Sequence, residues 1–492
     1  MKVMLCIPPG GYFAERWSQG SMMPSLGVLY LAAVLEQEAV DVEVVPSHVL
    51  KLNWENLARK FEHDKPDVIG ISTTTENRFQ SFQLAEIAKQ ARPEAFVLMG
   101  GPHFTGTARD TLTHISAIDG VISGEGELTI VELVKALQAD GDLRKVDGLT
   151  FWDEGRIFEN AARQRIPDLN TLPLPARHLI PWEKYHFQLE VPGKGMQPAA
   201  NLMTSRGCPF HCTFCATPNN WGRRVRGLKP DNVLKELEHV IEHYNAKVIW
   251  FYDDTFNYNP RRTMQICDMI IERKLDIKWY CEVRVDLMTR ELTEKMAAAG
   301  MFYAGFGIES GNHRVAQDIV KKVATLEQAD KFIEWALECG VTPNPFFMFS
   351  HPTESWEESQ ETMTVIERVK DRCDISVAIS HIYPGTELEA RAYQEGKLPK
   401  DFSWTRKRDK RVLVLPAAQG HAPLYVDKLN WWQISELMFR FAGAKKKFSL
   451  LRKVPSVLKN IHSFDDVTRY VIMFLVFAKY KLKKMRRPRR GT

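Results

Sequence analysis

The sequence predicts an α/β protein in which an N-terminal doubly wound parallel sheet of Rossmann-like type precedes a partial TIM barrel and a helical C-terminal region. Three observations predict this order. Strand-like and helix-like segments alternate about five times before residue 140, six further strands with helices between them follow residue 199, and the chain end is amphipathic and basic. We expect four parts, over residues 1–140, 141–198, 199–395 and 396–492.

The first sheet is expected to bind a ligand at the carboxyl ends of its strands, where doubly wound folds hold their ligands. Polar or glycine-rich stretches follow four of these strands, at residues 8–11, 72–75, 100–103 and 124–127. Glycine lets a ligand approach the backbone, and hydroxyl groups bond its polar groups. The alternative is a set of ordinary βα turns. No GxGxxG fingerprint opens the first helix, so a simple dinucleotide fold is not supported.

Residues 141–198 are predicted to connect the two domains. The stretch "VDGLTFWDEGRIFEN" places polar turn residues between two short apolar runs, which is typical of a hairpin. The stretch "IPDLNTLPLPARHLIPWEKY" is too rich in proline for a regular element. We expect it to lie along the surface between the domains.

Three of the eight cysteines lie within eight positions, directly after the first predicted barrel strand: Cys208, Cys212 and Cys215. Three thiolates at this spacing can reach one metal cluster. A tetrahedral zinc site would need a fourth ligand, and His211 is poorly placed to join its neighbouring cysteines on one ion. A 4Fe–4S cluster held by three cysteines would leave one iron open for substrate. The other five cysteines are scattered, unlike a disulfide framework, which predicts a reducing cytoplasm.

The stretch "TSRGCPFHCTFC" in this context resembles the radical S-adenosylmethionine (SAM) superfamily. With "GGPH" and "GEGE" in the preceding sheet, the chain is similar to the cobalamin-binding subgroup, which includes carbon methyltransferases and the anaerobic magnesium-protoporphyrin monomethyl ester cyclase. Further matches are "WGRRVR", "FYDDTF", "CEVRVD", "FGIES" and "YPGT". The chain departs from the subgroup at "FSHPTES", where relatives usually have glycine in place of Ser350 and Thr353.

The resemblance implies three cofactors: a 4Fe–4S cluster, SAM and cobalamin. The open iron would chelate the methionine part of SAM, and one-electron reduction would yield a 5′-deoxyadenosyl radical that abstracts hydrogen. An electron donor of the flavodoxin or ferredoxin type would be a partner. The chain contains no D-x-H-x-x-G stretch, so the resemblance implies base-off cobalamin without a conventional histidine ligand.

The resemblance and the strand ends together predict the site residues. The cluster ligands are the three cysteines of the motif. For SAM we expect contacts from the side chains at the barrel strand ends and from one aromatic residue between the cysteines: Phe214, Asp254, Arg284, Glu309 and Ser310. Arg284 would pair with the SAM carboxylate, and Glu309 and Ser310 suit ribose hydroxyls. Structural salt bridges are the alternative. Asp253 and Asp254 should face opposite sides of the sheet, so only one would face the site.

For cobalamin we expect contacts from the polar strand ends of the first sheet. These residues are Gly10, Ser72, Thr73, Thr74, Gly100, Gly101, His103, Gly124 and Glu125. His103 could approach the corrin, but packing or a hydrogen bond to the cofactor tail is the role that we expect of it.

The C-terminal region carries a short apolar stretch, Val471 to Ala478, followed by eight Lys or Arg among the twelve residues from Lys479 to Arg490. The apolar stretch is too short to span a bilayer, but the pattern suits a helix lying on an anionic membrane surface. We expect a cytoplasmic protein, with no secretory signal, that touches the inner face of the membrane. The alternative is a helix packed on the barrel with a solvated tail. Nucleic acid is not expected, because no recognised binding module accompanies the charge.

Two enzyme functions fit this pattern. The preferred one is a methyltransferase that methylates an unactivated carbon through a 5′-deoxyadenosyl radical and methylcobalamin. The alternative is a radical SAM oxidative cyclase or oxidoreductase. A cobalamin- and cluster-binding sensor is disfavoured by the complete barrel. The amphipathic basic tail favours a small-molecule substrate that is lipid-like or a tetrapyrrole.

Overall fold

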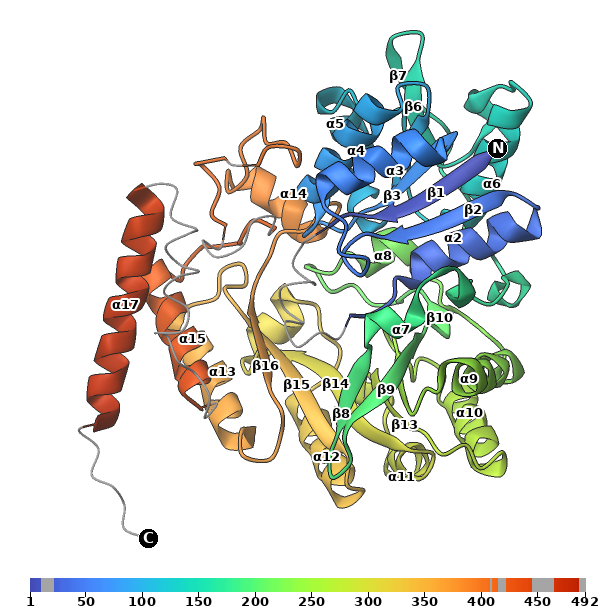
Figure 1. The fold of residues 1–492 in the computed structure, drawn as a ribbon. Coiled ribbons are helices and arrows are strands. Elements are labelled where there is room, and N and C mark those ends of the chain that lie inside the picture. Colours follow the sequence, from blue (N-terminus) through green and yellow to red (C-terminus); the bar gives the residue numbers. More distant parts are fainter. Residues whose placement is uncertain (10–21, 408, 415–421, 445–463, 486–492) are drawn as a thin grey trace.

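The computed structural model describes residues 1–9, 22–407, 409–414, 422–444 and 464–485 of the 492-residue chain (Figure 1). These residues form two seven-stranded sheets and one two-stranded ribbon. The first sheet carries the N-terminal domain, and the second is the curved sheet of the barrel domain. The predicted fold class is confirmed.

The first sheet has the strand order β2-β1-β3-β4-β5-β6-β7. Its parallel strands are β1 (Lys2–Ile7), β2 (Asp41–Pro46), β3 (Val68–Ser72), β4 (Phe96–Gly100) and β5 (Gly120–Ile122). Its helices are α2 (Leu26–Gln37), α3 (Trp54–Asp64), α4 (Arg78–Ala91), α5 (Ala108–His114) and α6 (Glu127–Gln138). Because β1 lies between β2 and β3, the connections reverse direction there, and this switch point is where such folds hold ligands.

The predicted hairpin forms and adds to the first sheet. Strands β6 (Leu149–Asp153) and β7 (Arg156–Glu159) pair antiparallel with each other, and β6 pairs with β5. The proline-rich segment that follows holds only short elements, namely η3 (Leu169–Thr171), η4 (Arg177–Leu179) and α7 (Trp182–Tyr185). Its exposed residues include Asp168, Thr171 and His178, whereas Ala176 and Ile180 join an apolar core cluster and Arg177 is fully buried. Arg177 pairs with Glu236 at 2.6 Å.

The second sheet has the order β16-β15-β14-β13-β12-β9-β8, with six parallel strands and one antiparallel edge strand. The strands are β8 (Gln188–Val191), β9 (Gly195–Leu202), β12 (Val248–Phe251), β13 (Lys278–Glu282), β14 (Met301–Glu309), β15 (Thr342–Phe349) and β16 (Ser376–Ile379). The helices are α9 (Pro230–Tyr244), α10 (Pro260–Glu272), α11 (Arg290–Ala298), α12 (Leu326–Glu338) and α13 (Trp356–Val369), which cover the outer face (Figure 1). The main apolar core lies between that face and these helices.

The two positions at which the resemblance implies glycine, Ser350 and Thr353, have an unusual backbone. Ser350 has φ 68° and Thr353 has φ 60°, the left-handed region that favours glycine. Contacts with a distant segment hold both residues: Ser350 Oγ donates to the carbonyl of Tyr425 at 2.8 Å, and Thr353 N donates to Asp427 at 3.0 Å. These contacts hold the two residues in a backbone conformation that is unfavourable for side chains other than glycine.

After helix α14 (Glu387–Gln394) the chain returns to the N-terminal domain and packs Trp404 against it. The carbonyl of Trp404 accepts a hydrogen bond from Arg78 Nε at 2.9 Å, and its ring lies 5.8 Å from that of His103. Helices α15 (Trp431–Ala444) and α17 (Phe464–Met485) then pack together at the edge of the barrel domain. Among the described helices, none has the length and apolar character needed to cross a membrane.

Candidate active site between the two sheets

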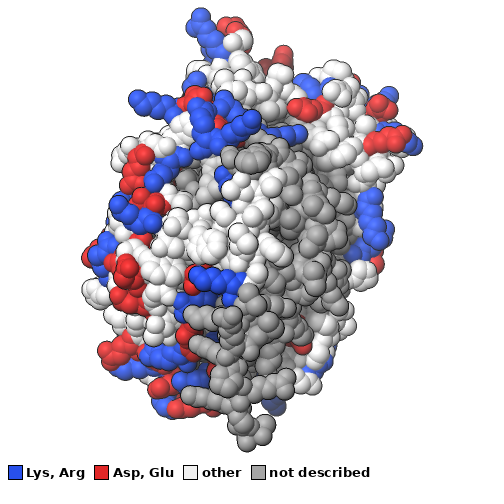
Figure 2. All heavy atoms as spheres, turned by 90° about the vertical axis from the view of Figure 1, so that its left-hand side faces the viewer, with Lys and Arg blue, Asp and Glu red and all other residues white. Residues whose placement is uncertain are grey.

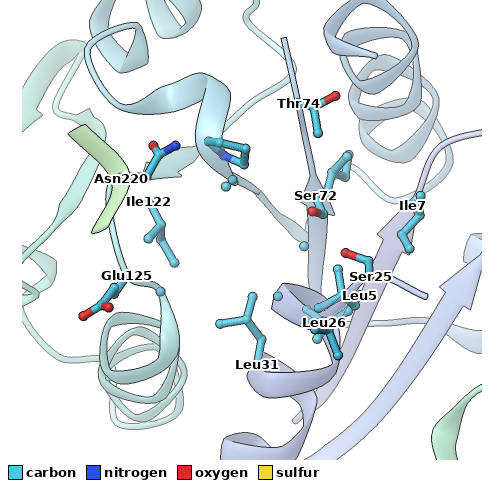
Figure 3. Close-up of a pocket in the computed structure, with 18 of the residues that line it drawn as sticks. Leu5, Ile7, Ser25, Leu26, Leu31, Ser72, Thr74, Ile122, Glu125 and Asn220 are labelled. Atoms are coloured by element: carbon cyan, nitrogen blue, oxygen red, sulfur yellow. The ribbon is translucent and has the colours of Figure 1, made fainter. Parts of the chain in front are cut away.

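A cavity of about 500 Å³ lies at the carboxyl edge of the first sheet and extends to the barrel. Figure 3 shows its wall on the first domain, where apolar side chains such as Leu31 and Ile122 face hydroxyl groups of Ser25, Ser72 and Thr74. The barrel contributes the opposite wall from three segments, with the lining residues Asn201, Met203, Thr217, Asn220, Trp221, Tyr252 and Asp254. The cavity therefore lies between two strand-end surfaces that belong to different domains.

Six of the nine residues predicted to contact cobalamin line this cavity: Ser72, Thr74, Gly100, Gly101, Gly124 and Glu125. Gly101 has φ 112°, and a Cβ there would lie 2.5 Å from the carbonyl oxygen of Thr73, so only glycine fits. Thr73 and His103 are fully buried beside the cavity and are not among its lining residues. His103 packs against Phe104 and Trp404. Gly10 lies outside the described residues.

The three motif cysteines are half-buried on the loop after β9. Neighbouring segments fix this loop by backbone hydrogen bonds, from Cys208 N to the Gly222 carbonyl at 3.1 Å and from Thr213 N to the Val320 carbonyl at 3.2 Å. Burial raises the pKa of all three thiols, so metal binding would be what holds them as thiolates. In the part of the chain that the structure describes, no three His, Cys, Asp or Glu side chains are grouped to hold one metal ion.

Two arginines close the base of the cysteine loop. Strands β10 (Ser205–Arg206) and β11 (Arg226–Gly227) pair antiparallel, and Arg206 lies opposite Arg226. Both arginines form ion pairs with Glu125 of the first domain, at 3.3 and 2.8 Å, and Arg206 also pairs with Glu127 at 2.6 Å. All four side chains are buried. We call this group the interdomain clamp, because it joins the loop after β5 to the cysteine loop.

The clamp changes what can be expected of Glu125. Its carboxylate accepts hydrogen bonds from both arginines and from Ile166 N at 2.7 Å, so its oxygens are already used. Contact between Glu125 and cobalamin stays a prediction. The backbone of Glu125, and not its carboxylate, is the part that remains available for this contact. Burial lowers the pKa of Arg206, but the ion pairs with Glu127 and Glu125 outweigh that effect and raise it.

The residues predicted to bind SAM lie at the strand ends around the loop, and several already have partners. Arg284 pairs with Asp286 through Nε at 2.8 Å and stacks 3.4 Å above the Phe210 ring. Glu309 pairs with Lys322 at 3.2 Å. The hydroxyl of Ser310 lies 3.1 Å from that of Thr362, and Phe214 is half-buried against a small apolar cluster after β16. Their contacts with SAM stay predictions.

The side chains of the two adjacent aspartates, Asp253 and Asp254, lie in different surroundings. Asp253 is buried and accepts hydrogen bonds from Thr204 and Ser205, at 2.7 and 2.5 Å, which ties the end of β12 to the start of the cysteine loop. Asp254 lines the cavity, where it accepts a hydrogen bond from Thr217 at 2.8 Å. Burial raises the pKa of Asp254 to about 6.

Two comparisons with known proteins identify the domains. Residues 202–366 match the radical SAM superfamily model, and residues 18–134 match the B12 binding domain model. A relative from Pyrococcus horikoshii, named uncharacterized methyltransferase PH0819, is 33% identical over 389 residues, which cover 79% of this chain and 82% of the relative. The chain belongs to the cobalamin-binding radical SAM family.

Other members of the family show how far the likeness extends. The anaerobic magnesium-protoporphyrin IX monomethyl ester cyclase of Cereibacter sphaeroides is 27% identical over 72% of this chain and 57% of its own length. The radical SAM methyltransferase TsrM from Kitasatospora setae, solved with cobalamin and a [4Fe-4S] cluster, superposes with a TM-score of 0.72 at 16% identity, over 96% of this chain and 99% of that chain. This second likeness establishes the shared fold.

The cofactors of this cobalamin-binding radical SAM protein are the 4Fe–4S cluster, SAM and cobalamin. The residues present fit them. Three thiols on one fixed loop match a cluster that keeps one iron free, since each thiol would bind a different iron and the three need not meet at one ion. The cavity at the switch point has glycine and hydroxyl groups for a large amide-bearing cofactor, and a Cβ on its lining residue Gly27 would meet no atom within 4 Å.

Several residues that line the cavity or lie beside it were not predicted from the sequence. His48 lies in its lining, its Nδ1 has no hydrogen-bond partner among the described residues, and burial lowers its pKa to about 4. The sequence signal was a polar side chain two residues after a predicted strand. Arg206 and Arg226 lie within the quoted motifs, but their shared partner Glu125 is 81 and 101 residues away in the sequence.

Proposed function

We propose that this protein is a methyltransferase that transfers a methyl group to an unactivated carbon of a small-molecule substrate. One observation supports this most: the cavity expected to hold cobalamin opens directly onto the barrel strand ends, where Tyr252 and Asp254 form part of its wall. When bound, the cluster and SAM supply a hydrogen-abstracting radical, and cobalamin supplies the methyl group. The protein fixes the cysteine loop, orients both reactants across one cavity and excludes water.

The products test this proposal directly. Each methylation would consume two SAM molecules and two electrons, delivered by a donor of the flavodoxin or ferredoxin type. One SAM would yield methionine and 5′-deoxyadenosine, and the other S-adenosylhomocysteine. We expect the two adenosyl products in about equal amounts when the reduced protein turns over in an extract of its own cells, measured by liquid chromatography and mass spectrometry. Formation of 5′-deoxyadenosine alone would favour the oxidative cyclase, to which the cyclase relative lends support.

Cobalamin binding can be tested by filling the cavity from Gly27. Replacing Gly27 with Trp is expected to reduce cobalamin retention at least about tenfold, because the side chain would project into the open space beside the first turn of α2. Gly27→Ala is the control, since its added Cβ meets no neighbouring atom. The cobalt content after anaerobic gel filtration measures the effect, and equal retention by both variants would contradict the assignment of the cavity.

We further propose that the bound cobalamin is base-off and has no histidine ligand. The electron paramagnetic resonance spectrum of its Co(II) form is expected to lack nitrogen superhyperfine splitting. His48 is the histidine among the residues that line the cavity, so its ring nitrogen would be the candidate ligand of the cobalt. Clear splitting that disappears in His48→Ala would contradict the proposal and identify the ligand.

We also propose peripheral contact between helix α17 and an anionic membrane. Its apolar side chains at helical spacing are exposed, at 37% for Val467, 50% for Val471, 60% for Phe474 and 49% for Leu475, whereas Val476 is buried. Figure 2 turns this side of the molecule toward the viewer, with uncharged surface in the middle of the face, Lys and Arg side chains above it, and mixed basic and acidic side chains beside and below it. The helix thus packs on α15 by one face and leaves a second apolar face outward, as an interfacial helix would.

Vesicle flotation tests this contact. The triple variant V471N/F474N/L475N is expected to weaken binding to vesicles of anionic phospholipid about a hundredfold, because each apolar side chain contributes on the order of 1 kcal/mol of insertion. Binding of the unmodified protein should weaken as salt rises, since the basic residues act through screened charge. Ile271→Asn, at an exposed apolar position of α10, is the control. Flotation unchanged by the triple variant would leave α17 with a structural role only.

A further inference from the structure

The concave face of the barrel sheet carries one aromatic ring on each of four adjacent strands. These rings belong to Trp250 on β12, Tyr280 on β13, Tyr303 on β14 and Phe346 on β15, and we call them the ring row. The ring centroids of Trp250 and Tyr280 are 4.6 Å apart, and those of Tyr280 and Tyr303 are 5.5 Å apart. All four side chains are only half-buried.

Strand alternation places the ring row opposite the main core. The neighbouring side chains Ile249, Trp279 and Ala304 are fully buried beneath the outer helices, so Trp250, Tyr280 and Tyr303 point to the other face. A Cβ at Gly305 would lie 2.7 Å from Phe346 Cζ, so this glycine makes room for the Phe346 ring. Half-buried aromatic rings gathered on a concave face are typical of a ligand site.

Polar groups border the ring row on the side of the cysteine loop. Glu282 ends β13 on the same face as Tyr280, and Tyr252 lies 5.3 Å from Trp250 between centroids. Neither the carboxyl of Glu282 nor the hydroxyls of Tyr252 and Tyr280 form a hydrogen bond with another described residue. Tyr252 also lines the cavity expected to hold cobalamin. The ring row therefore lies beside the reaction centre.

The groups that face Glu282 favour its neutral form. Burial, Asp254 and Glu309 raise its pKa to about 7, and Lys322 opposes this. Below that pH the protonated carboxyl can donate a hydrogen bond to a ligand, and above it the charged form cannot.

We propose that the substrate is a planar conjugated ring system with a hydrogen-bond acceptor at its edge, stacked on the ring row and bonded by Glu282. A flat ring presents its face or edge to each aromatic neighbour, as aromatic pairs require. A saturated acyl chain would cover the unpaired hydroxyls and the carboxyl without bonding them, which is unfavourable. This inference rests on the proposed function, since it concerns the substrate of the same site.

A matched set of probes tests the inference without turnover. The probes are 2-naphthamide, its fully saturated decahydro form and decanamide, which share an amide acceptor and differ in planarity. Saturation-transfer difference NMR at pH 6 is expected to show 2-naphthamide binding at least tenfold more tightly than the other two. Tyr280→Leu should remove this preference, and Ile271→Leu should not. Equal binding of all three probes, or no binding of 2-naphthamide, would overturn the inference.

A second measurement separates the contribution of the Glu282 carboxyl to ligand binding from that of the aromatic rings. Affinity for 2-acetonaphthone, a planar ring with a hydrogen-bond acceptor and no donor, should fall about tenfold between pH 6 and pH 8 in the unmodified protein and stay constant in Glu282→Gln, whose amide donates at any pH. A Glu282→Gln variant with the same pH dependence would remove Glu282 from the proposal. Because these readouts need no SAM cleavage, their failure leaves the product test of the methyltransferase intact, and the reverse also holds.

Discussion

Replacing Cys212 with alanine is expected to abolish the charge-transfer absorbance of the reconstituted cluster and to reduce SAM cleavage to the background of the assay. Cys212 is half-buried in the middle of the fixed loop, and the thiols of Cys208 and Cys215 are its electrostatic neighbours. Two thiols cannot hold a cuboidal cluster with a single open iron, so no partial activity should remain. The absorbance spectrum, the iron content and the yield of 5′-deoxyadenosine measure the effect.

Cys339→Ala is the matched control for this experiment. Cys339 is also a partly buried free thiol, but it caps the carboxyl end of α12, away from the loop. Its replacement should leave cluster content and SAM cleavage unchanged. Normal iron content and activity in the Cys212 variant would exclude the assigned cluster.

Replacing Glu125 with glutamine is expected to destabilise the protein by about 3–5 kcal/mol, because it leaves buried arginine charge without its partner. Glu125 is 4% exposed, and it is the acidic group that pairs with Arg226. Of the clamp only the Arg206–Glu127 pair would remain between the first domain and the cysteine loop, so cobalamin retention should fall together with the melting temperature of the cofactor-free protein. Differential scanning calorimetry and cobalt content measure the two effects.

The control for the clamp is an ion pair of the same residue types at the surface. Glu55 pairs with Arg59 on α3, and the side chains are 72% and 65% exposed. Glu55→Gln should cost less than about 1 kcal/mol, because exposed pairs are screened by water. Similar melting temperatures for the Glu125 and Glu55 variants would mean that burial of the clamp contributes little to stability.

Local patterns were sufficient to predict the fold and the cysteine loop. Short apolar runs that alternate with amphipathic segments predict the βα repeat. A strand of a sheet covered by helices is buried on both faces, so its sequence is a continuous apolar run. The three cysteines that would bind the cluster lie within eight residues of one another, so their spacing alone was enough to predict the cluster site. The glycine-rich strand ends likewise predicted the cavity edge, since Gly101 needs a backbone that only glycine adopts there.

The clamp and the ring row could not be predicted in the same way. Glu125 meets Arg206 and Arg226 only because two domains pack together, and no local pattern reports a contact across 81 or 101 residues. The ring row is assembled from four strands, each of which contributes a single ring. Periodicity assigns these rings to a face of each strand, but the curvature of the sheet decides whether that face is core or ligand site.

The return of the chain to the first domain at Trp404 has a consequence for synthesis on the ribosome. Arg78 is only 4% exposed, and its guanidinium donates to the carbonyls of Thr75 and Trp404, the latter 326 residues later in the chain. When the first domain emerges, this cation and the neighbouring His103 lack their cover. Arg78 and His103 must therefore stay open to water until the whole barrel and Trp404 have been translated, so this side of the first domain reaches its final packing only late in synthesis.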